Sequence, residues 1–335
     1  MLNIIASTLM LALTNSADAA PVWNWEAAQE RIWYLESHTI LPQPLWFQAQ
    51  HNDEARVGRV EVRLIARCHP AAHSGRRQRI DCRLDDVAFS GTALAADTGQ
   101  LTPVLEEMDA LVSGKTVSLE MNADGTMASF DLEGWERSDR RASEQHELIR
   151  QLLQSTFAGL DLKLPTTNQP GDGWRQRNPR LIAYPDPMAG MVIGKANHAI
   201  TQRDAVALEI QTNAQISMAL GASGNIHPDS KVMRLYGDLE SMALFNEAEG
   251  VLVGRTWMVH CVEAGQAGTT GVYIEGDTAP EGAVYIQAGL VRLLDGEPLP
   301  EVGPTGENQF QGTTIAWAEQ ALWGEKPDIH VAVVP

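Results

Sequence analysis

Two of the three cysteines lie where they could form a covalent bond. Cys68 ends a strand-like run, residues 60–67, and Cys82 lies early in another run after a polar loop. If the two runs pair as a hairpin, the sulfurs face each other, and an oxidising compartment would close a disulfide. His69 and His73 lie beside Cys68, so a thiolate and imidazole metal site is the alternative, although the spacing matches no standard zinc module. We predict a Cys68–Cys82 disulfide and no metal.

The histidines and acidic residues show no catalytic motif. His198, His227 and His260 have unrelated spacings, and their convergence in space cannot be seen in a sequence. His146 lies on a predicted helix without the second histidine that a metalloprotease helix carries four residues later. No nucleophile elbow, phosphate-binding loop or dinucleotide loop occurs. We therefore predict no catalytic residue and no cofactor, and a secreted hydrolase whose site lacks a motif remains an alternative.

Asn122, Asp124 and Gly125 lie between two short strand-like runs, residues 116–121 and 126–132. The two polar side chains suggest calcium, but the other acidic ligands of a calcium loop are missing. A hairpin turn, with the glycine at a positive φ, is the favoured interpretation.

Aromatic residues crowd the region that follows residue 20. Rings at this density either fill a core or contact a ligand or a membrane interface. The candidates for ligand contact are Trp23, Trp25, Trp33, Trp46 and Phe47.

The first 20 residues resemble an export signal. Residues 1–13 are uncharged and mostly apolar, and the small residues Ala17, Ala19 and Ala20 precede Pro21, as signal-peptidase cleavage requires. A buried N-terminal helix is the alternative, because no Lys or Arg precedes the apolar run. No later segment is apolar over the length that spans a bilayer. We predict a periplasmic or secreted protein with no transmembrane segment in the mature chain.

Composition and charge exclude several classes of protein. The chain has 335 residues, 44% of them hydrophobic, so it is neither a disordered tail nor a coiled coil. Its net charge of −18 argues against nucleic acid as a partner. Eight arginines nevertheless lie between residues 56 and 83. This basic hairpin either meets an anionic surface or is partly paired with the acidic part of the chain.

Alternating apolar and β-branched residues dominate both halves of the chain. We predict an α+β fold, mainly antiparallel curved sheets or a half-barrel, with two or three amphipathic helices. Helices are predicted near residues 102–113 and 138–158, the second ending at Gly159. The predicted organisation is a signal peptide at 1–20, an N-terminal β-rich domain at 21–160, a connection at 161–173, an antiparallel β domain at 174–295, and a Pro/Gly/Glu-rich tail at 296–335 with a short helix and strand.

The run from the second helix through Leu164-Pro165 to Gly171-Asp172-Gly173-Trp174 resembles a pattern in bacterial secreted proteins of unknown function. Those proteins are broadly similar to the envelope lipoprotein-carrier fold, a curved antiparallel half-barrel closed by helices over an apolar cavity. The resemblance covers about the middle third of the chain and implies no catalytic residue.

With the aromatic residues and the amphipathic helices, this resemblance leads us to expect a non-enzymatic exported envelope protein. Its expected partner is a lipid, a lipoprotein or another apolar small molecule. The alternative is a periplasmic or surface module that binds another envelope protein, for which an exposed flat apolar patch would be the sign.

Overall fold

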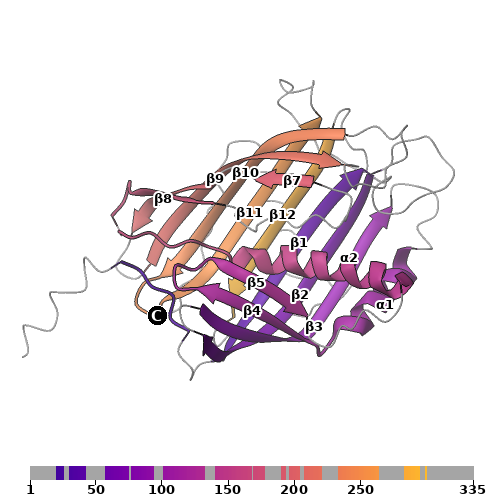
Figure 1. Ribbon diagram of the computed structural model, residues 1–335, viewed down its shortest axis with the longest axis horizontal. Helices are drawn as coiled ribbons and strands as arrows, with labels where there is room; N and C mark the ends of the chain where they lie inside the picture. The colour runs from indigo at the N-terminus through magenta and orange to yellow at the C-terminus, as the bar shows by residue number, and fades with distance from the viewer. Residues whose placement is uncertain are drawn as a thin grey trace, which may run out of the picture.

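The computed structural model describes residues 20–25, 30–42, 57–74, 77–93, 101–132, 140–167, 169–177, 190–193, 196–203, 207–220, 233–263, 283–294 and 299. These residues form one antiparallel sheet, two α-helices and a 3-10 turn (Figure 1). The strands are β1 Arg31–Pro42, β2 Val57–Ser74, β3 Arg77–Ala93, β4 Thr116–Asn122, β5 Met127–Leu132, β6 Gly173–Gln176, β7 Gly190–Ile193, β8 Ala196–Arg203, β9 Ala207–Leu220, β10 Met233–Asn246, β11 Val251–Glu263 and β12 Ala283–Leu293. The helices are α1 Leu101–Val112 and α2 Arg140–Phe157, and the 3-10 turn η3, Ala158–Leu160, follows α2 directly.

The two halves of the chain share one sheet. Its strand order is β5-β4-β3-β2-β1-β12-β11-β10-β9-β8-β6, and β7 pairs with β9 off this path. β1 and β12 meet at the centre, where Ser37 lies opposite Gly289. Strands from both sides of the predicted connection at 161–173 therefore lie in a single continuous sheet. In the described part of the chain, twelve strands accompany only two helices, so the fold is more strongly β than the predicted α+β class.

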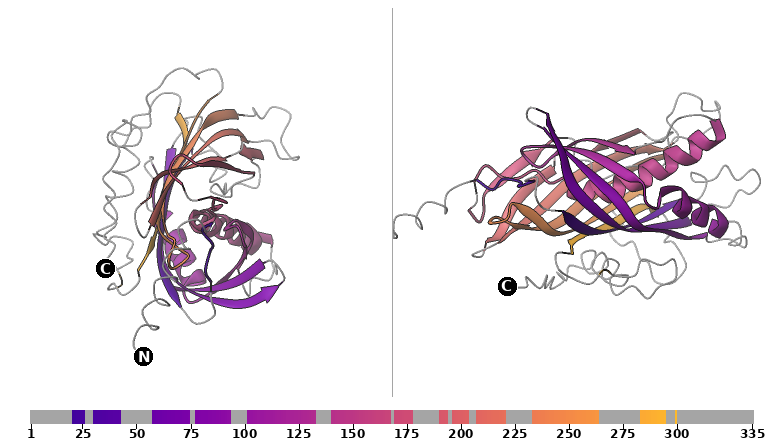
Figure 2. Two further views of the ribbon diagram at one scale, coloured as in Figure 1. Left: turned by 90° about the vertical axis from the view of Figure 1, so that its left-hand side faces the viewer. Right: turned by 90° about the horizontal axis from the view of Figure 1, so that it is seen from below.

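The sheet is curved and has a covered concave face. Figure 2 shows the N-terminal strands curling around α2, which lies on that face. α2 buries Ile149, Leu152 and Phe157 at the spacing of an amphipathic helix. The hydroxyls of Ser37 on β1 and Thr156 on α2 share a hydrogen bond of 2.7 Å. The helix is thus fixed to the centre of the sheet by both apolar and polar contacts.

Strand β9 illustrates how the sequence sets the two faces. Side chains alternate across a strand, so every second residue points to the same face. The buried set consists of Leu208, Ile210, Thr212, Ala214 and Ile216. The intervening residues, from Glu209 to Ser217, are polar and half-buried or exposed. The concave face is therefore largely apolar and the convex face of this strand is polar.

Both predicted hairpins are present. Cys68 on β2 lies opposite Cys82 on β3, and a disulfide joins them as predicted. Between β4 and β5, Gly125 has a φ of 84°. The amide of Asn122 donates to the Thr126 hydroxyl at 2.9 Å, which is a turn contact.

Both predicted helices lie within two residues of their expected bounds, but the role assigned to Gly159 was wrong. It lies inside η3 and does not have a positive φ. A Cβ on Gly159 would come within 2.3 Å of Val291 and 2.5 Å of Trp257. Glycine is needed there because η3 lies against the sheet, and it does not cap the helix.

No helix of the described residues is long and apolar enough to cross a membrane. Residues 1–19, which hold most of the predicted signal peptide, lie outside the described residues, as does nearly all of the predicted tail.

Candidate functional site

One row of side chains crosses the concave face in register over nine strands, and we call it the inner row. Direct cross-strand pairs link each member to the next. From β6 to β3 the row consists of Trp174, His198, Thr212, Ser241, Trp257, Gly289, Ser37, Val62 and Phe89. Its central members Trp257, Gly289 and Ser37 lie where α2 and η3 meet the sheet.

The indole of Trp257 packs between η3 and the sheet. A Cβ on Gly289 of β12 would lie 2.0 Å from Cζ2 of the indole, and a Cβ on Gly159 would lie 2.5 Å from Cζ3. Neither approach is sterically possible, so both positions accept only glycine while the indole keeps its place. The close contact on two sides holds the indole fully buried.

Arg255 is buried beside Trp257, two residues earlier on the same strand and face. Its Nε donates to Ser241 Oγ at 2.8 Å, and its Nη1 donates to the carbonyl oxygens of Gly159 and Asp161 at 3.2 and 2.8 Å. These carbonyls follow the end of α2, where backbone acceptors lack helical partners and carry partial negative charge. Nη2 has no hydrogen-bond partner among the described residues, and the nearby Asp161 carboxylate supplies the negative charge that acts on the guanidinium. Burial lowers the pKa of Arg255 to about 10.

His198 is held neutral by its surroundings. Its ring stacks on Trp174 at a centroid distance of 5.3 Å, and Nδ1 shares a hydrogen bond of 2.8 Å with the Thr212 hydroxyl. Burial, followed by the positive charges of Arg255 and Lys163, lowers its pKa to about 3. His198 was one of the three candidate histidines. His227 and the side chain of His260 lie outside the described residues.

Hydrogen bonds hold the segment after η3 in place, and one of them comes from Trp174 of the motif on which the family resemblance is based. Trp174 donates from Nε1 to the Lys163 carbonyl at 2.8 Å. The Asp161 carboxylate accepts hydrogen bonds from the Met127 amide at 2.7 Å and from Gln176 Nε2 at 3.1 Å. Both carboxylate oxygens of Asp161 therefore accept hydrogen bonds, and the negative charge of this carboxylate acts on Arg255.

The aromatic candidates fall into three groups. Trp23 stacks on Trp25 at 5.2 Å, packs edge-on against Phe245, and donates to the Leu162 carbonyl at 3.4 Å. Trp33 is fully buried on β1. Trp46 and Phe47 lie outside the described residues. Trp23 and Trp33 belong to the core, Trp25 is half-buried against it, and a ligand contact by any of these rings stays a prediction.

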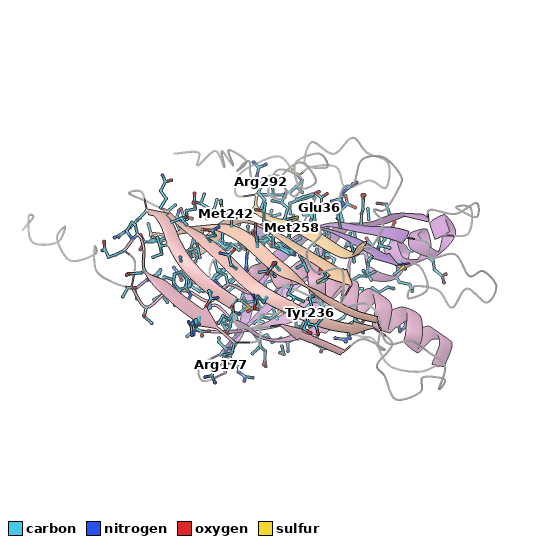
Figure 3. All side chains as sticks on the ribbon, turned by 90° about the horizontal axis from the view of Figure 1, so that it is seen from above. Glu36, Arg177, Tyr236, Met242, Met258 and Arg292 are labelled. Atoms are coloured by element: carbon cyan, nitrogen blue, oxygen red, sulfur yellow. A yellow bond between two sulfur atoms is a disulfide. The ribbon has the colours of Figure 1, made fainter. Side chains whose placement is uncertain are left out.

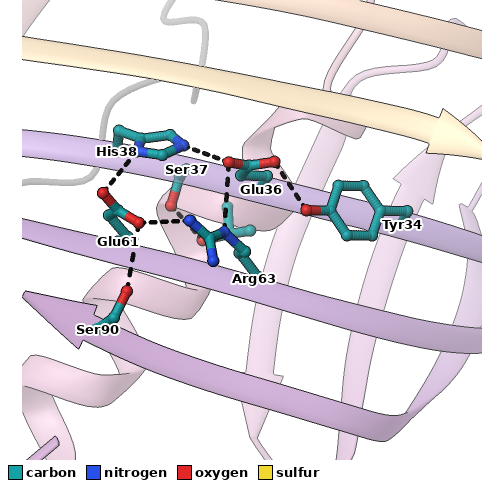
Figure 4. A network of polar contacts seen from close by, with 8 residues as sticks. Tyr34, Glu36, Ser37, His38, Glu61, Arg63 and Ser90 are labelled. Carbon is teal, nitrogen blue, oxygen red and sulfur yellow. Dashed lines mark hydrogen bonds and ion pairs between the residues drawn. The ribbon is translucent and has the colours of Figure 1, made fainter. Parts of the chain in front are cut away.

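A second polar cluster is buried on the convex face of β1, β2 and β3 (Figure 4). His38 contacts Glu36 through Nε2 and Glu61 through Nδ1, the latter at 3.4 Å. Arg63 lies 2.6 Å from Glu61 and 3.5 Å from Glu36. The Tyr34 hydroxyl donates to Glu36 at 2.7 Å. The sequence reasoning missed this cluster, whose signal is opposite charge at alternate positions of two adjacent strands.

The cluster is an ion network and lacks the geometry of a catalytic triad. Burial lowers the pKa of His38, but hydrogen bonds to Glu36 and Glu61 outweigh it, so the pKa is raised. His38 and Arg63 then balance the two carboxylates. A histidine that acts as a general base needs a free ring nitrogen facing a nucleophile, and both nitrogens of His38 face carboxylates.

Two methionines lie beside this cluster on the convex face of β10 and β11. Met242 and Met258 lie near Glu36 and Arg292 on the side away from α2 (Figure 3). Met258 is buried and Met242 half-buried.

Among the described residues, the remaining reactive groups are either paired or unreactive. Burial raises the pKa of the Cys261 thiol to about 12, which makes it a poor nucleophile. The described residues hold no group of three metal-ligating side chains. Besides Arg63, four arginines of the basic hairpin form ion pairs: Arg67 with Glu30 and Asp85, Arg77 with Glu120, Arg79 with Asp81, and Arg83 with Asp85.

No protein-family model matches the chain, and no curated protein is similar to it. A solved structure of lipovitellin, from work on lipid–protein interactions in that protein, is distantly similar, with a TM-score of 0.42 and 8% sequence identity. The match covers 85% of this chain and 27% of the lipovitellin chain, so this protein spans about a quarter of it. A likeness this distant carries no argument about function.

Proposed function

We propose that this is a non-enzymatic exported protein that binds an apolar ligand, such as a lipid, on the concave face of its sheet. The observation that carries the proposal is the extent of that face beyond α2. Figure 1 shows α2 crossing the sheet and β9 to β12 extending well past it towards β7. The concave side chains there are mainly apolar and include Ile216, Leu239, Val259 and Cys261. These side chains are at most 3% exposed, so an apolar ligand would bind here by replacing the groups that cover them.

Exposed residues favour an apolar ligand over the alternative of a protein-interaction module. A docking module of that kind would show a contiguous exposed apolar patch. In the described part of the chain, the exposed large hydrophobic residues are Val22, Tyr236 and Leu299, which are scattered along the chain.

The Cys68–Cys82 disulfide supports the export part of the proposal. Stable structural disulfides form in oxidising compartments such as the periplasm or the medium. The signal-like residues 1–20 support the same placement.

Intact mass spectrometry, native and then denaturing, tests both parts on protein expressed with its leader. We expect a chain that begins at Ala20 or Pro21 and is two hydrogens light, with a native adduct that is lost on denaturation. A full-length reduced chain would contradict export. Absence of an adduct, together with no binding of the neutral dye N-phenyl-1-naphthylamine, would contradict ligand binding.

Two neighbours on β10 give matched variants for locating the site. Leu239→Gln places an amide on the concave face, whereas Glu240→Gln changes an exposed residue on the convex face. We expect Leu239→Gln to weaken dye binding by about tenfold or more, which corresponds to about 1.4 kcal/mol. Glu240→Gln should bind like the wild type. Equal dye affinity in all three proteins would place the site elsewhere.

A further inference from the structure

We propose that the C-terminal segment of this chain, residues 300–335, docks on the convex face of β11, β12, β1 and β2. This contact is independent of the proposed function, which concerns the concave face. It is based on the uneven burial of the convex face and on the place where the chain leaves β12.

The convex face is buried over its central strands and exposed over β9 and β10. One cross-strand row shows the contrast, because Met258 on β11 pairs with Glu240 on β10, which pairs with Asn213 on β9. Met258 is 4% exposed, whereas Glu240 and Asn213 are exposed. Tyr34 and Glu36 of β1, on the same face, are fully buried. A sheet face that meets water keeps its side chains exposed, so the central strands need a covering layer.

The described residues do not supply this layer. Both helices pack on the other side, where Met108 of α1 and Ile149 of α2 belong to the core cluster of the concave face. The apolar cluster of the convex face consists of strand residues and one residue that follows β12, namely Tyr34, Ile65, Ala88, Leu290 and Leu294. The cover of the central strands must therefore be sought outside the described residues.

The chain passes from β12 directly to this face. The backbone amide of Leu294 donates to the Ile32 carbonyl at 2.8 Å, and the Leu294 side chain is buried within the convex cluster. Residues 43–56 and 264–282 also lie outside the described residues, but they join β1 to β2 and β11 to β12 at the opposite end of these strands. The C-terminal segment is thus the occupant that starts beside the buried apolar cluster.

The C-terminal segment has the apolar residues and the length that the face requires. Residues 314–323 are predicted to form a helix, and Ile315 and Leu322, seven positions apart, lie on one side of it. A helix of ten residues spans about 15 Å, and four strands about 4.8 Å apart cover about the same width. The polar cluster of β1 and β2 already balances its own charges, so an apolar helix face fits over it.

Photo-crosslinking of the full chain, with photo-methionine in place of every methionine, tests the proposal. The diazirine of photo-methionine is nearly the size of the methionine side chain, so the packing is kept. We expect mass spectrometry to find a crosslink within one molecule from position 258 to residues 300–335. Met127 is also 4% exposed but belongs to the concave core, and position 127 should form no such crosslink. Crosslinks from position 258 only to residues 43–56, to residues 264–282 or to a second copy of the chain would overturn the proposal, as would no crosslink to the C-terminal segment.

Deletion of residues 300–335 gives a second readout. Oxidation of methionine follows its exposure, so the rate at which hydrogen peroxide oxidises Met258 should rise about tenfold, towards that of the half-buried Met242 on the adjacent strand. Met127 should stay protected, which shows together with circular dichroism that the shortened chain is folded. Unchanged protection of Met258 in the folded shortened chain would overturn the proposal. If the shortened chain does not fold, the crosslink in the full chain decides.

Discussion

Acidification from pH 7 to pH 5 should destabilise the protein through His198. The unfolded chain takes up a proton on this imidazole near pH 6.5, whereas burial and the nearby charges of Arg255 and Lys163 lower its folded pKa to about 3. Between these values the unfolded state binds more protons, so stability falls as the pH falls. At about 1.4 kcal/mol per pH unit, His198 contributes a loss of about 2 kcal/mol at pH 5 and roughly 4 kcal/mol at pH 3.

The variant His198→Phe isolates this contribution. Phenylalanine keeps a ring against Trp174 but cannot be protonated, although it gives up the hydrogen bond to Thr212. The variant should be less stable than the wild type at pH 7, and the free-energy difference should shift in its favour by about 2 kcal/mol at pH 5.

Urea unfolding followed by circular dichroism at pH 7, 6 and 5, at constant ionic strength, measures both proteins. His69→Gln, which removes an exposed histidine on β2, is the control for loss of one imidazole. Parallel stability curves for the wild type and His198→Phe from pH 7 to pH 5 would refute the argument, because they would show that His198 takes up its proton equally in both states.

Two further predictions concern the core and the convex cluster. Gly289→Ala drives a Cβ into Trp257 and should lower the free energy of unfolding by about 1–3 kcal/mol. Gly173→Ala, whose Cβ would meet only a carbonyl at 3.5 Å, should change this free energy little. Thermal unfolding compares the two variants, and equal losses of stability would contradict the packing argument. The raised pKa of His38 stabilises the fold fully below pH 6.5, and this contribution is lost as the pH rises through the folded value. His38→Gln should therefore flatten the fall in stability seen in urea unfolding from pH 6 to pH 9, and an unchanged slope would contradict this role.

Features that depend on neighbours in the sequence could be predicted from it. α2 was predicted because apolar residues recur at three and four positions, and the β4–β5 turn because Gly125 takes the positive φ that the turn requires. The Cys68–Cys82 disulfide followed from a short hairpin whose register brings the two residues opposite each other. In each case the partners are close in the chain, so the pattern itself contains the contact.

β1 shows what the sequence could not predict. Glu36, Ser37, His38 and Thr39 are polar, which is typical of an exposed segment, yet all four are buried. Their burial depends on β2 and on β12, which begins more than 240 residues later. Glu36 and His38 are tolerated there because Arg63 and Glu61 of β2 balance their charges.

The candidate site also depends on tertiary structure. Arg255 is an ordinary strand residue in the sequence, and nothing near it predicts that its side chain is buried. Its contacts arise because the segment at η3, about a hundred residues earlier, presents the backbone carbonyls of Gly159 and Asp161 to the guanidinium. Gly159 and Gly289 allow this approach by leaving room for Trp257. The sequence by itself determined the strands, helices and turns through local spacing, whereas charge burial and the position of the site were decided by pairings between distant strands.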